Sequence, residues 1–444
     1  MSKNVPSSFI IVVGFMLFAL FFGAGNLIFP AMLGQASGSN IWEANAGFIV
    51  TGVGLPLLGV MAFGFSGKGD LHSLASRVHP AFGLIFTVVL YLAIGPFFAL
   101  PRTGSVSYEI AVKPFLSGDP GFLPLLLFTV LFFAVTCFFS LNPARIVDVV
   151  GKWLTPLLLI FIAILIFTVI FKPMGEFGEA TGPYVSHPFF KGFQEGYLTM
   201  DTLASFVFGI IVINAIREKG VTGKKQLMII CTKAGLIAAL LLAVIYTSLT
   251  YMGALSIEPL GYLDNGGAVL AGISHYYFGG FGGVLLGLIV TAACLTTSIG
   301  LVTACAAYFH KLFPRLSYKA LAIILSAFSA VVANIGLNQL ISISVPILTA
   351  IYPLAIVLIA LTFTHSWFKG RAAVYRMSLL FTFIVSLFDG LKAAGYEWSA
   401  LSDFFMSILP LYEEGLGWLL PAIIGALLGY IISLLVNPKL ETTE

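Results

Sequence analysis

Three short groups of residues could do chemistry that a plain apolar helix cannot. The first is the run Gly23-Ala24-Gly25-Asn26, followed by Pro30, inside a long apolar segment. Glycine, asparagine and proline interrupt a helix, and an interruption in hydrocarbon survives only where it lines a cavity or is buried in protein. Freed carbonyls can bind a cation, and freed amides at a half-helix start can bind a carboxylate. The run predicts a binding site; close helix packing, with Asn26 as interhelical glue, is the alternative.

The second candidate is Asp201, the only acidic residue that we place deep within the first ten apolar segments. A charge at the bilayer centre costs at least about 2.5–3.5 kcal/mol on insertion scales, so it must meet a partner, a cavity or water. Two roles fit this residue: pairing with the ammonium of a substrate, or carrying a proton or cation. A structural role, with hydrogen bonds to Thr199 and Thr202, is the alternative.

The third candidate is the run Thr296-Thr297-Ser298, which follows Ala293 in another apolar segment. A single hydroxyl in a membrane helix usually donates to a carbonyl of its own helix. Three hydroxyls in succession cover nearly a full turn, so some must face other helices. With the carbonyl of Ala293 they offer an oxygen shell for a hard cation, and the broken first segment strengthens this interpretation.

The composition shows what must position these residues. The chain has 444 residues, of which 59% are hydrophobic and 9% charged. Soluble proteins carry roughly 25% charged residues, so the chain is predicted to be an all-α integral membrane protein. The net charge of +3 is too small and scattered to indicate nucleic-acid binding. No nucleotide-binding loop or nucleophile motif is present, and we do not expect an enzyme. We also expect no prosthetic group. The expected surroundings are the lipid bilayer, without an obligatory protein partner.

Twelve membrane-spanning helices are expected. Their orientation follows from the basic residues, because cytoplasmic loops carry an excess of Lys and Arg. With the N-terminus inside, 17 of the 22 basic residues fall on the inner side, and Arg102, Lys113, Lys172, Lys191 and Lys392 fall outside. Both termini are therefore predicted to be cytoplasmic, in the plasma or inner membrane. The predicted spans are 9–34, 42–65, 80–102, 121–140, 154–172, 193–216, 228–254, 280–309, 319–336, 341–364, 373–393 and 416–436.

The interruptions indicate an inverted repeat. The segment 196–209, around Asp201, is again polar and glycine-bearing at mid-depth, and it lies five spans after the first interruption. An odd number of spans per repeat gives the second copy the opposite topology, as in many secondary transporters. We therefore expect a 5+5 inverted repeat with spans 1 and 6 broken, in one transporter domain. The repeats would cover about 9–172 and 193–364, with two extra spans over about 373–436.

The run from Phe18 to Pro30 closely resembles the branched-chain amino acid:cation symporter family, the BrnQ-type carriers. The resemblance extends over the whole chain, including the length, the span count and the loop Asn142-Pro143-Ala144-Arg145. Members of this family import leucine, isoleucine and valine with sodium and are grouped with transporters of the LeuT-like fold. The resemblance thus implies a sodium-coupled symporter that works by alternating access.

The resemblance also implies roles for particular residues. Matching Gly-x-Gly-Asn places substrate near Gly23, Ala24, Gly25 and Asn26, and the looser match in span 6 adds Asp201, Ser205 and Phe208. A sodium ion between spans 1 and 8 would take carbonyls of Ala19, Phe22 and Ala293 and hydroxyls of Thr296 and Thr297. A threonine that holds a second sodium in some relatives falls near Leu203, which argues against a second ion.

Other functions remain open from the residues. A proton-coupled transporter of another small amino acid or solute would use Asp201 as its titrating group. A membrane-embedded enzyme would need several deep catalytic groups, and only Asp201 lies deep. A channel is a further alternative, although interruptions at matched positions favour a carrier.

Overall fold

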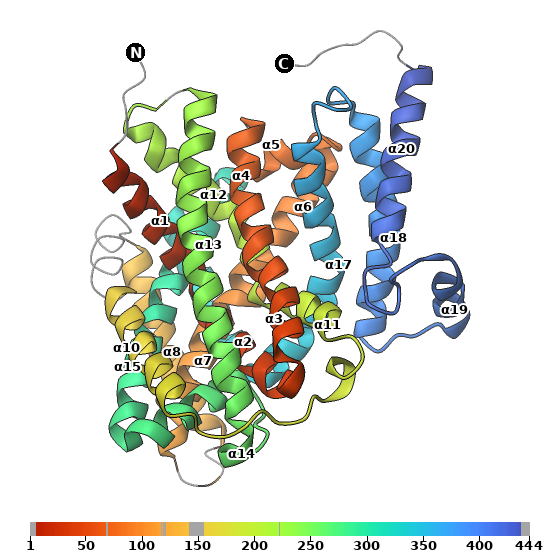
Figure 1. The fold of residues 1–444 in the computed structure, drawn as a ribbon. Helices are drawn as coiled ribbons and strands as arrows, with labels where there is room; N and C mark the ends of the chain where they lie inside the picture. The colour runs from red at the N-terminus through yellow and green to blue at the C-terminus, as the bar shows by residue number, and fades with distance from the viewer. Residues whose placement is uncertain are drawn as a thin grey trace.

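The computed structural model describes residues 6–67, 70–116, 118, 121–141, 155–221 and 223–436, and every regular element within them is a helix. The loop Asn142-Pro143-Ala144-Arg145 lies outside these residues. The helices pack side by side into one bundle, and α1 begins at the same end at which α20 finishes (Figure 1). The principal helices are α1 (Ser7–Phe21), α2 (Ala24–Ser37), α3 (Ile41–Ile49), α4 (Leu55–Ser66), α5 (Leu71–Ala75), α6 (Pro80–Leu92), α7 (Ala99–Ala111), α8 (Phe122–Ser140), α10 (Thr155–Phe171), α11 (Pro188–Glu195), α12 (Asp201–Glu218), α13 (Lys224–Leu255), α14 (Ile257–Leu260), α15 (Gly266–Leu312), α16 (Tyr318–Ala333), α17 (Leu337–Phe363), α18 (Ala372–Ala393), α19 (Ser399–Ile408) and α20 (Leu419–Val436).

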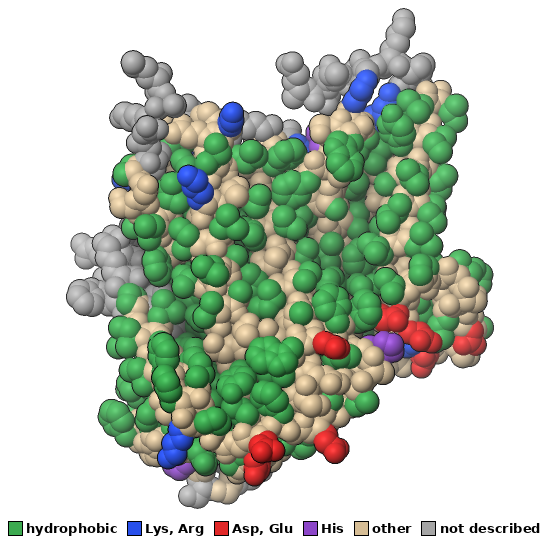
Figure 2. Space-filling model, in the orientation of Figure 1, with side chains coloured by type: hydrophobic (Ala, Val, Ile, Leu, Met, Phe, Trp, Pro, Cys, Tyr) green, Lys and Arg blue, Asp and Glu red, His purple; other side chains and the backbone are tan. Residues whose placement is uncertain are grey.

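The surface of the bundle matches a membrane environment. Figure 2 shows hydrophobic side chains over the middle, most of the visible Lys and Arg at the end where α1 begins, and Asp and Glu at the opposite end. Within the described residues, eight helical segments are long and apolar enough to cross a membrane, or nine with the bent pair that contains α11 and α12. Shorter apolar helices lie at Ser7–Phe21, Leu159–Phe171 and Tyr318–Ala333. Each of the twelve expected spans therefore coincides with helical structure.

Both expected interruptions are present. Span 1 is divided into α1 and α2 by Phe22 and Gly23, whose backbones are extended. Span 6 is divided by Met200, which has a φ of 65°, and its two halves meet at 46°. A left-handed conformation is uncommon for a residue with a side chain, so the surrounding packing must hold Met200 there.

Span 2 is irregular at the same level as the interruption in span 6. Between α3 and α4 the chain makes a π-helical turn at Val50–Gly54. The Thr51 hydroxyl donates to the Phe193 carbonyl at 2.7 Å, and the Thr202 hydroxyl donates to the Thr51 carbonyl at 3.2 Å. Span 2 is thus hydrogen-bonded to segments on both sides of Met200.

Span 3 differs from its expected extent. It bends at Gly95, which has non-helical torsions, and Pro96, and then continues through α7 to Ala111. Arg102 was expected at the external end of span 3, but this was wrong: its side chain is 2% exposed, in the first turn of α7. Gly95 and Pro96 bend the helix without ending it, so span 3 continues past the predicted boundary at residue 102.

Candidate functional site

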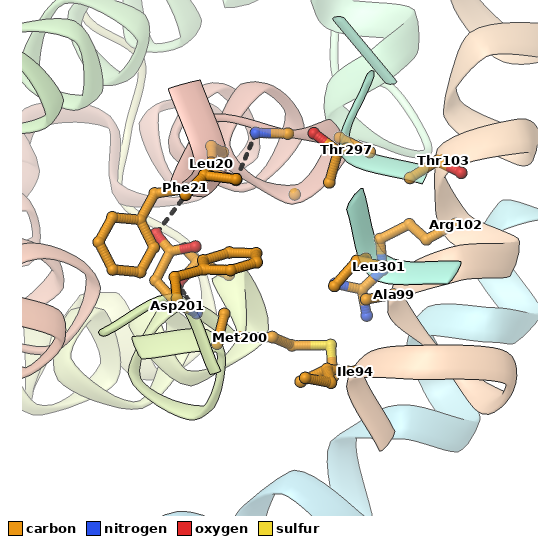
Figure 3. Close-up of a pocket in the computed structure, with 17 residues that line it drawn as sticks. Leu20, Phe21, Ile94, Ala99, Arg102, Thr103, Met200, Asp201, Thr297 and Leu301 are labelled. Atoms are coloured by element: carbon orange, nitrogen blue, oxygen red, sulfur yellow. Dashed lines mark hydrogen bonds between the residues drawn. The ribbon is translucent and has the colours of Figure 1, made fainter. Parts of the chain in front are cut away.

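A cavity lies where the two interruptions meet spans 3 and 8. Residues of spans 1, 3, 6 and 8 line the cavity, and Figure 3 shows their side chains around it. Gly23, Ala24, Gly25 and Asn26, which the sequence singles out as a candidate binding site, all line it. The remaining lining residues are largely apolar: Leu20, Phe21, Ile94, Ala99, Arg102, Thr103, Thr199, Met200, Asp201, Ala204, Phe208, Thr297 and Leu301.

A hydrogen-bonded triad joins the two interruptions. The Asn26 side-chain oxygen accepts from the Gly23 amide at 3.0 Å, and its nitrogen donates to Asp201 Oδ2 at 2.6 Å and to the Tyr246 hydroxyl. Tyr246, from α13, also donates to Asp201 Oδ2 at 2.7 Å. All three side chains are at most 2% exposed. The buried carboxylate therefore has two donors and holds the start of α12 against the start of α2.

Span 8 approaches the first interruption at Thr297. A Cβ atom built on Gly23 would lie 3.1 Å from Thr297 Oγ1, so glycine is what allows this close approach. The Thr297 hydroxyl is buried and has no hydrogen-bond partner among the described residues. Its usual acceptor is the Ala293 carbonyl, but the Thr296 hydroxyl donates to that carbonyl at 2.7 Å. Within the described residues, the Thr297 oxygen thus lies beside the interruption without a hydrogen-bond partner.

The interruption also frees backbone oxygen at the end of α1. In a continuous helix the Gly23 amide would donate to the Ala19 carbonyl. Here that amide donates to Asn26 instead, so the Ala19 carbonyl loses its helical donor. Phe22, which has an extended ψ of 92°, is the C-cap of α1. Of the five residues expected at a sodium site, only Thr297 lines the cavity; Ala19, Phe22, Ala293 and Thr296 lie in the segments just beside it.

The expected span 6 residues divide between two faces of α12. Asp201 and Phe208 line the cavity together with Ala204. Ser205 does not line it: its hydroxyl donates to the Thr202 carbonyl at 2.6 Å. A Cβ atom on Gly59 of α4 would overlap the same hydroxyl, so Ser205 faces α4. Leu203, near which the resemblance placed the threonine of a second sodium site, is completely buried.

Two residues at the site were not expected from the sequence. Tyr246 is an aromatic residue in an apolar helix, and nothing in its neighbourhood distinguishes it from a core residue. Arg102 carried a signal, because a basic residue next to an apolar segment is either at the membrane surface or functional. Its guanidinium lines the cavity and stacks on the Phe29 ring, with 4.9 Å from Cζ to the ring centroid.

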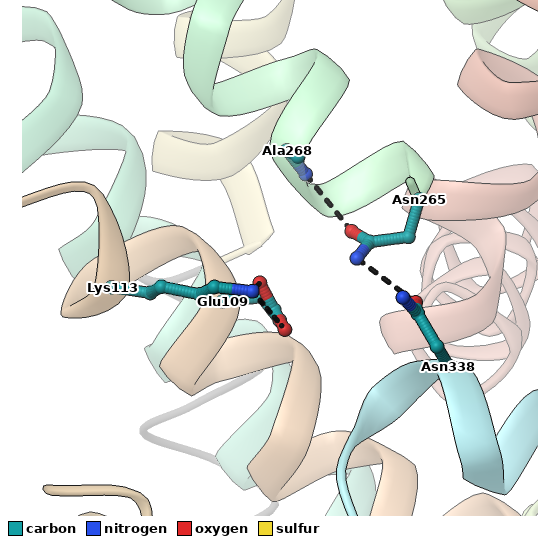
Figure 4. A network of polar contacts seen from close by, with 5 residues as sticks. All are labelled: Glu109, Lys113, Asn265, Ala268 and Asn338. Atoms are coloured by element: carbon teal, nitrogen blue, oxygen red, sulfur yellow. Dashed lines mark hydrogen bonds and ion pairs between the residues drawn. The ribbon is translucent and has the colours of Figure 1, made fainter. Parts of the chain in front are cut away.

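A second polar cluster lies near the starts of α15 and α17 (Figure 4). Asn265 accepts from the Ala268 amide and donates to Asn338, both at 3.0 Å. Lys113 forms an ion pair with Glu109 at 2.9 Å, one helical turn away. None of these side chains lines the cavity, so the cluster positions helix ends.

The helical bundle with two matched interruptions defines a transporter of the LeuT-like fold. Among solved structures, it is similar to MHP1, a nucleobase-cation-symport-1 family transporter in a closed conformation with bromovinylhydantoin bound. The TM-score is 0.63 at 13% identity, over 98% of this chain and 94% of that one. It is also similar to MhsT in complex with L-phenylalanine, with a TM-score of 0.57 at 17% identity, over 95% and 98% of the two chains. At these identities the likeness concerns the fold alone.

The chain belongs to the family described as branched-chain amino acid transport protein, whose model matches residues 7–436. It is 61% identical to the branched-chain amino acid permease BrnQ of Bacillus subtilis, over 98% of this chain and 99% of that protein. It is 54% identical to BraB of the same organism over the full length of both chains. BrnQ of Escherichia coli K12 is 43% identical over 97% of both chains. These relatives are permeases and not enzymes, so this chain is a multi-pass membrane transporter.

Proposed function

We propose that this protein is a sodium-coupled symporter that imports leucine, isoleucine and valine by alternating access. The substrate class follows from the permease relatives, which are named for branched-chain amino acids. The cavity suits such ligands, because apolar side chains such as Ile94, Phe208 and Leu301 can contact an aliphatic side chain. The substrate ammonium would meet Asp201, and its carboxylate would meet the amides around Gly23 to Gly25.

One observation supports sodium as the coupling ion: the unpartnered Thr297 hydroxyl beside the first interruption. The freed carbonyl of Ala19 lies in the same segment, and neither oxygen titrates near neutral pH. Neutral oxygen ligands suit a hard monovalent cation and need no proton exchange. Ala19, Phe22, Ala293, Thr296 and Thr297 would hold the ion between α1 and α15.

Proton coupling is the second candidate, and the burial of Asp201 favours it. This carboxylate is 2% exposed, lines the cavity and is hydrogen-bonded to Tyr246 and Asn26. Gain of a proton would change both hydrogen bonds and thereby the contact between the two interruptions. A proton carrier at this position would link substrate occupancy to the relative position of spans 1 and 6.

The distribution of charge supports an orientation with both termini in the cytoplasm. Most visible basic side chains lie at the end of the bundle where α1 begins (Figure 2), and cytoplasmic loops carry such an excess. The interruptions in α1–α2 and α11–α12 support two inverted repeats, over about 9–172 and 193–364, with extra spans over about 373–436.

The coupling ion can be identified by counterflow of labelled leucine in proteoliposomes. With choline replacing sodium at constant pH, a sodium symporter should lose exchange, and an imposed sodium gradient should drive net uptake. A proton symporter should keep exchange in choline and respond to a pH gradient. Absence of leucine exchange in both media would contradict the proposed substrate class.

A further inference from the structure

Arg102 is a buried cation in the wall of the cavity. Nη1 donates to the Leu198 carbonyl at 2.6 Å, and Nη2 donates to the Ser344 hydroxyl at 3.1 Å. Nε is also buried and has no hydrogen-bond partner in the described part of the chain. A guanidinium has five N–H donors, so this side chain keeps unused donor capacity while it is 2% exposed.

Arg102 also has no counter-charge among the residues that the structure describes. Among the described residues, no Asp or Glu oxygen forms an ion pair with it within 4.0 Å. The Leu198 carbonyl and the Ser344 hydroxyl supply dipoles but no net charge, and Phe29 supplies only a ring face. Buried charges inside membrane proteins are expensive and are normally paired. An anion that enters the cavity would supply the missing charge.

The start of α2 lies against the same guanidinium. A Cβ atom built on Gly25 would lie 3.5 Å from Arg102 Nη1. Since α2 begins at Ala24, its first amides have no intrahelical acceptors, and such a helix end favours negative charge. A cation and a helix start thus meet at one part of the cavity wall, and both favour an anion.

The acidic residue of the site lies across the cavity. Figure 3 shows Asp201 on one side and Arg102 on the other, with Met200, Ile94 and Leu301 around the space between them. No ion pair joins the two charges. A ligand whose ammonium and carboxylate groups are attached to the same carbon atom, as in an α-amino acid, complements such an arrangement.

The structure assigns Arg102 as the residue that binds the α-carboxylate of the transported amino acid, opposite Asp201. This inference rests on the proposed function, in that the ligand must be an amino acid. It adds a charged, side-chain contact to the backbone amides of α2. Guanidinium and carboxylate form short charge-assisted hydrogen bonds, which an uncharged carboxyl derivative cannot form equally well.

The test compares two ligands that differ only in the carboxylate. Leucine and leucinamide would be titrated in sodium buffer against the purified full-length protein, with the shift in melting temperature as the signal of binding. We expect Arg102→Gln to lower the affinity for leucine about 10- to 100-fold and to change the affinity for leucinamide little, so that the preference for leucine is lost. Arg102→Lys, which keeps the positive charge but lacks the planar guanidinium with its paired N–H donors, should give an intermediate preference for leucine.

Ser105→Ala is the matched control, because Ser105 is a buried residue of the same helix, donates to the Ala333 carbonyl at 3.0 Å and does not line the cavity. It should keep the wild-type preference for leucine. If Arg102→Gln and Arg102→Lys weaken both ligands equally, or neither, Arg102 is structural and the assignment is overturned. That result, with sodium-dependent leucine binding by the wild type, leaves the proposed function standing. Failure of the wild type to bind leucine overturns both.

Discussion

The sodium site can be tested by removing one oxygen from Thr297. Thr297→Val preserves the shape of the side chain and deletes a hydroxyl that has no hydrogen-bond partner in the described part of the chain. Because no protein hydrogen bond is lost, the stability of the fold should change little. If the hydroxyl is a sodium ligand, its loss should cost about 1–3 kcal/mol, or about 5- to 150-fold in sodium affinity.

The assay is leucine binding measured over a range of sodium concentrations. Coupling between two ligands is reciprocal, so leucine affinity at low sodium should fall in Thr297→Val and recover partly at high sodium. Thr303→Val is the matched control, since Thr303 also lies in α15 with a buried, unpartnered hydroxyl but does not line the cavity. A wild-type sodium midpoint in Thr297→Val would mean that the cation binds elsewhere and that the span 1–span 8 site is wrong.

Three further variants test the triad, the first interruption and helix packing. Gly25→Leu should abolish uptake at normal membrane levels, because a Cβ there would already contact Phe29 at 3.3 Å and Arg102 at 3.5 Å and the rest of the leucine side chain would have to enter the cavity; normal transport would indicate that the stretch serves helix packing. Asp201→Asn should raise the Michaelis constant for leucine more than it alters sodium dependence, whereas a flattened pH profile of uptake would indicate proton coupling. Gly34→Ala should lower the melting temperature of the purified protein, because its Cβ would overlap the Thr250 carbonyl of α13; an unchanged melting temperature would mean that α2 and α13 can separate without cost.

The sequence predicts the interruptions well, because their signals are local. Glycines with Asn26 in an apolar run, and a lone Asp201 at mid-depth, conflict with an uninterrupted membrane helix wherever the other helices lie. Both groups of residues lie in the wall of the cavity. The extent of span 3 was predicted less well: the helix bends at Gly95 and Pro96 and continues to Ala111, so Arg102 is buried in the bundle and does not lie at the external end.

Local sequence signals did not predict which way a side chain points or which residues of other spans it contacts. Ser205 and Ala204 are neighbours, yet successive residues on a helix point about 100° apart, so only Ala204 lines the cavity. Tyr246 meets Asn26 and Asp201 only through the packing of α13 against both interruptions. The unpartnered state of Thr297 likewise depends on which hydroxyl bonds to the Ala293 carbonyl, which a sequence does not specify.

The hydrogen bonds of Thr51 have a mechanical consequence. They connect the π-helical turn of span 2 to Phe193 before Met200 and to Thr202 after it. A change in the angle between the two halves of span 6 would have to break one of these hydrogen bonds or bend span 2 at Val50–Gly54. A π-helical turn can shift its hydrogen-bond register locally, which makes it a suitable place for such bending. Spans 2 and 6 are thus linked on both sides of Met200, and we expect any movement of one to be coupled to movement of the other.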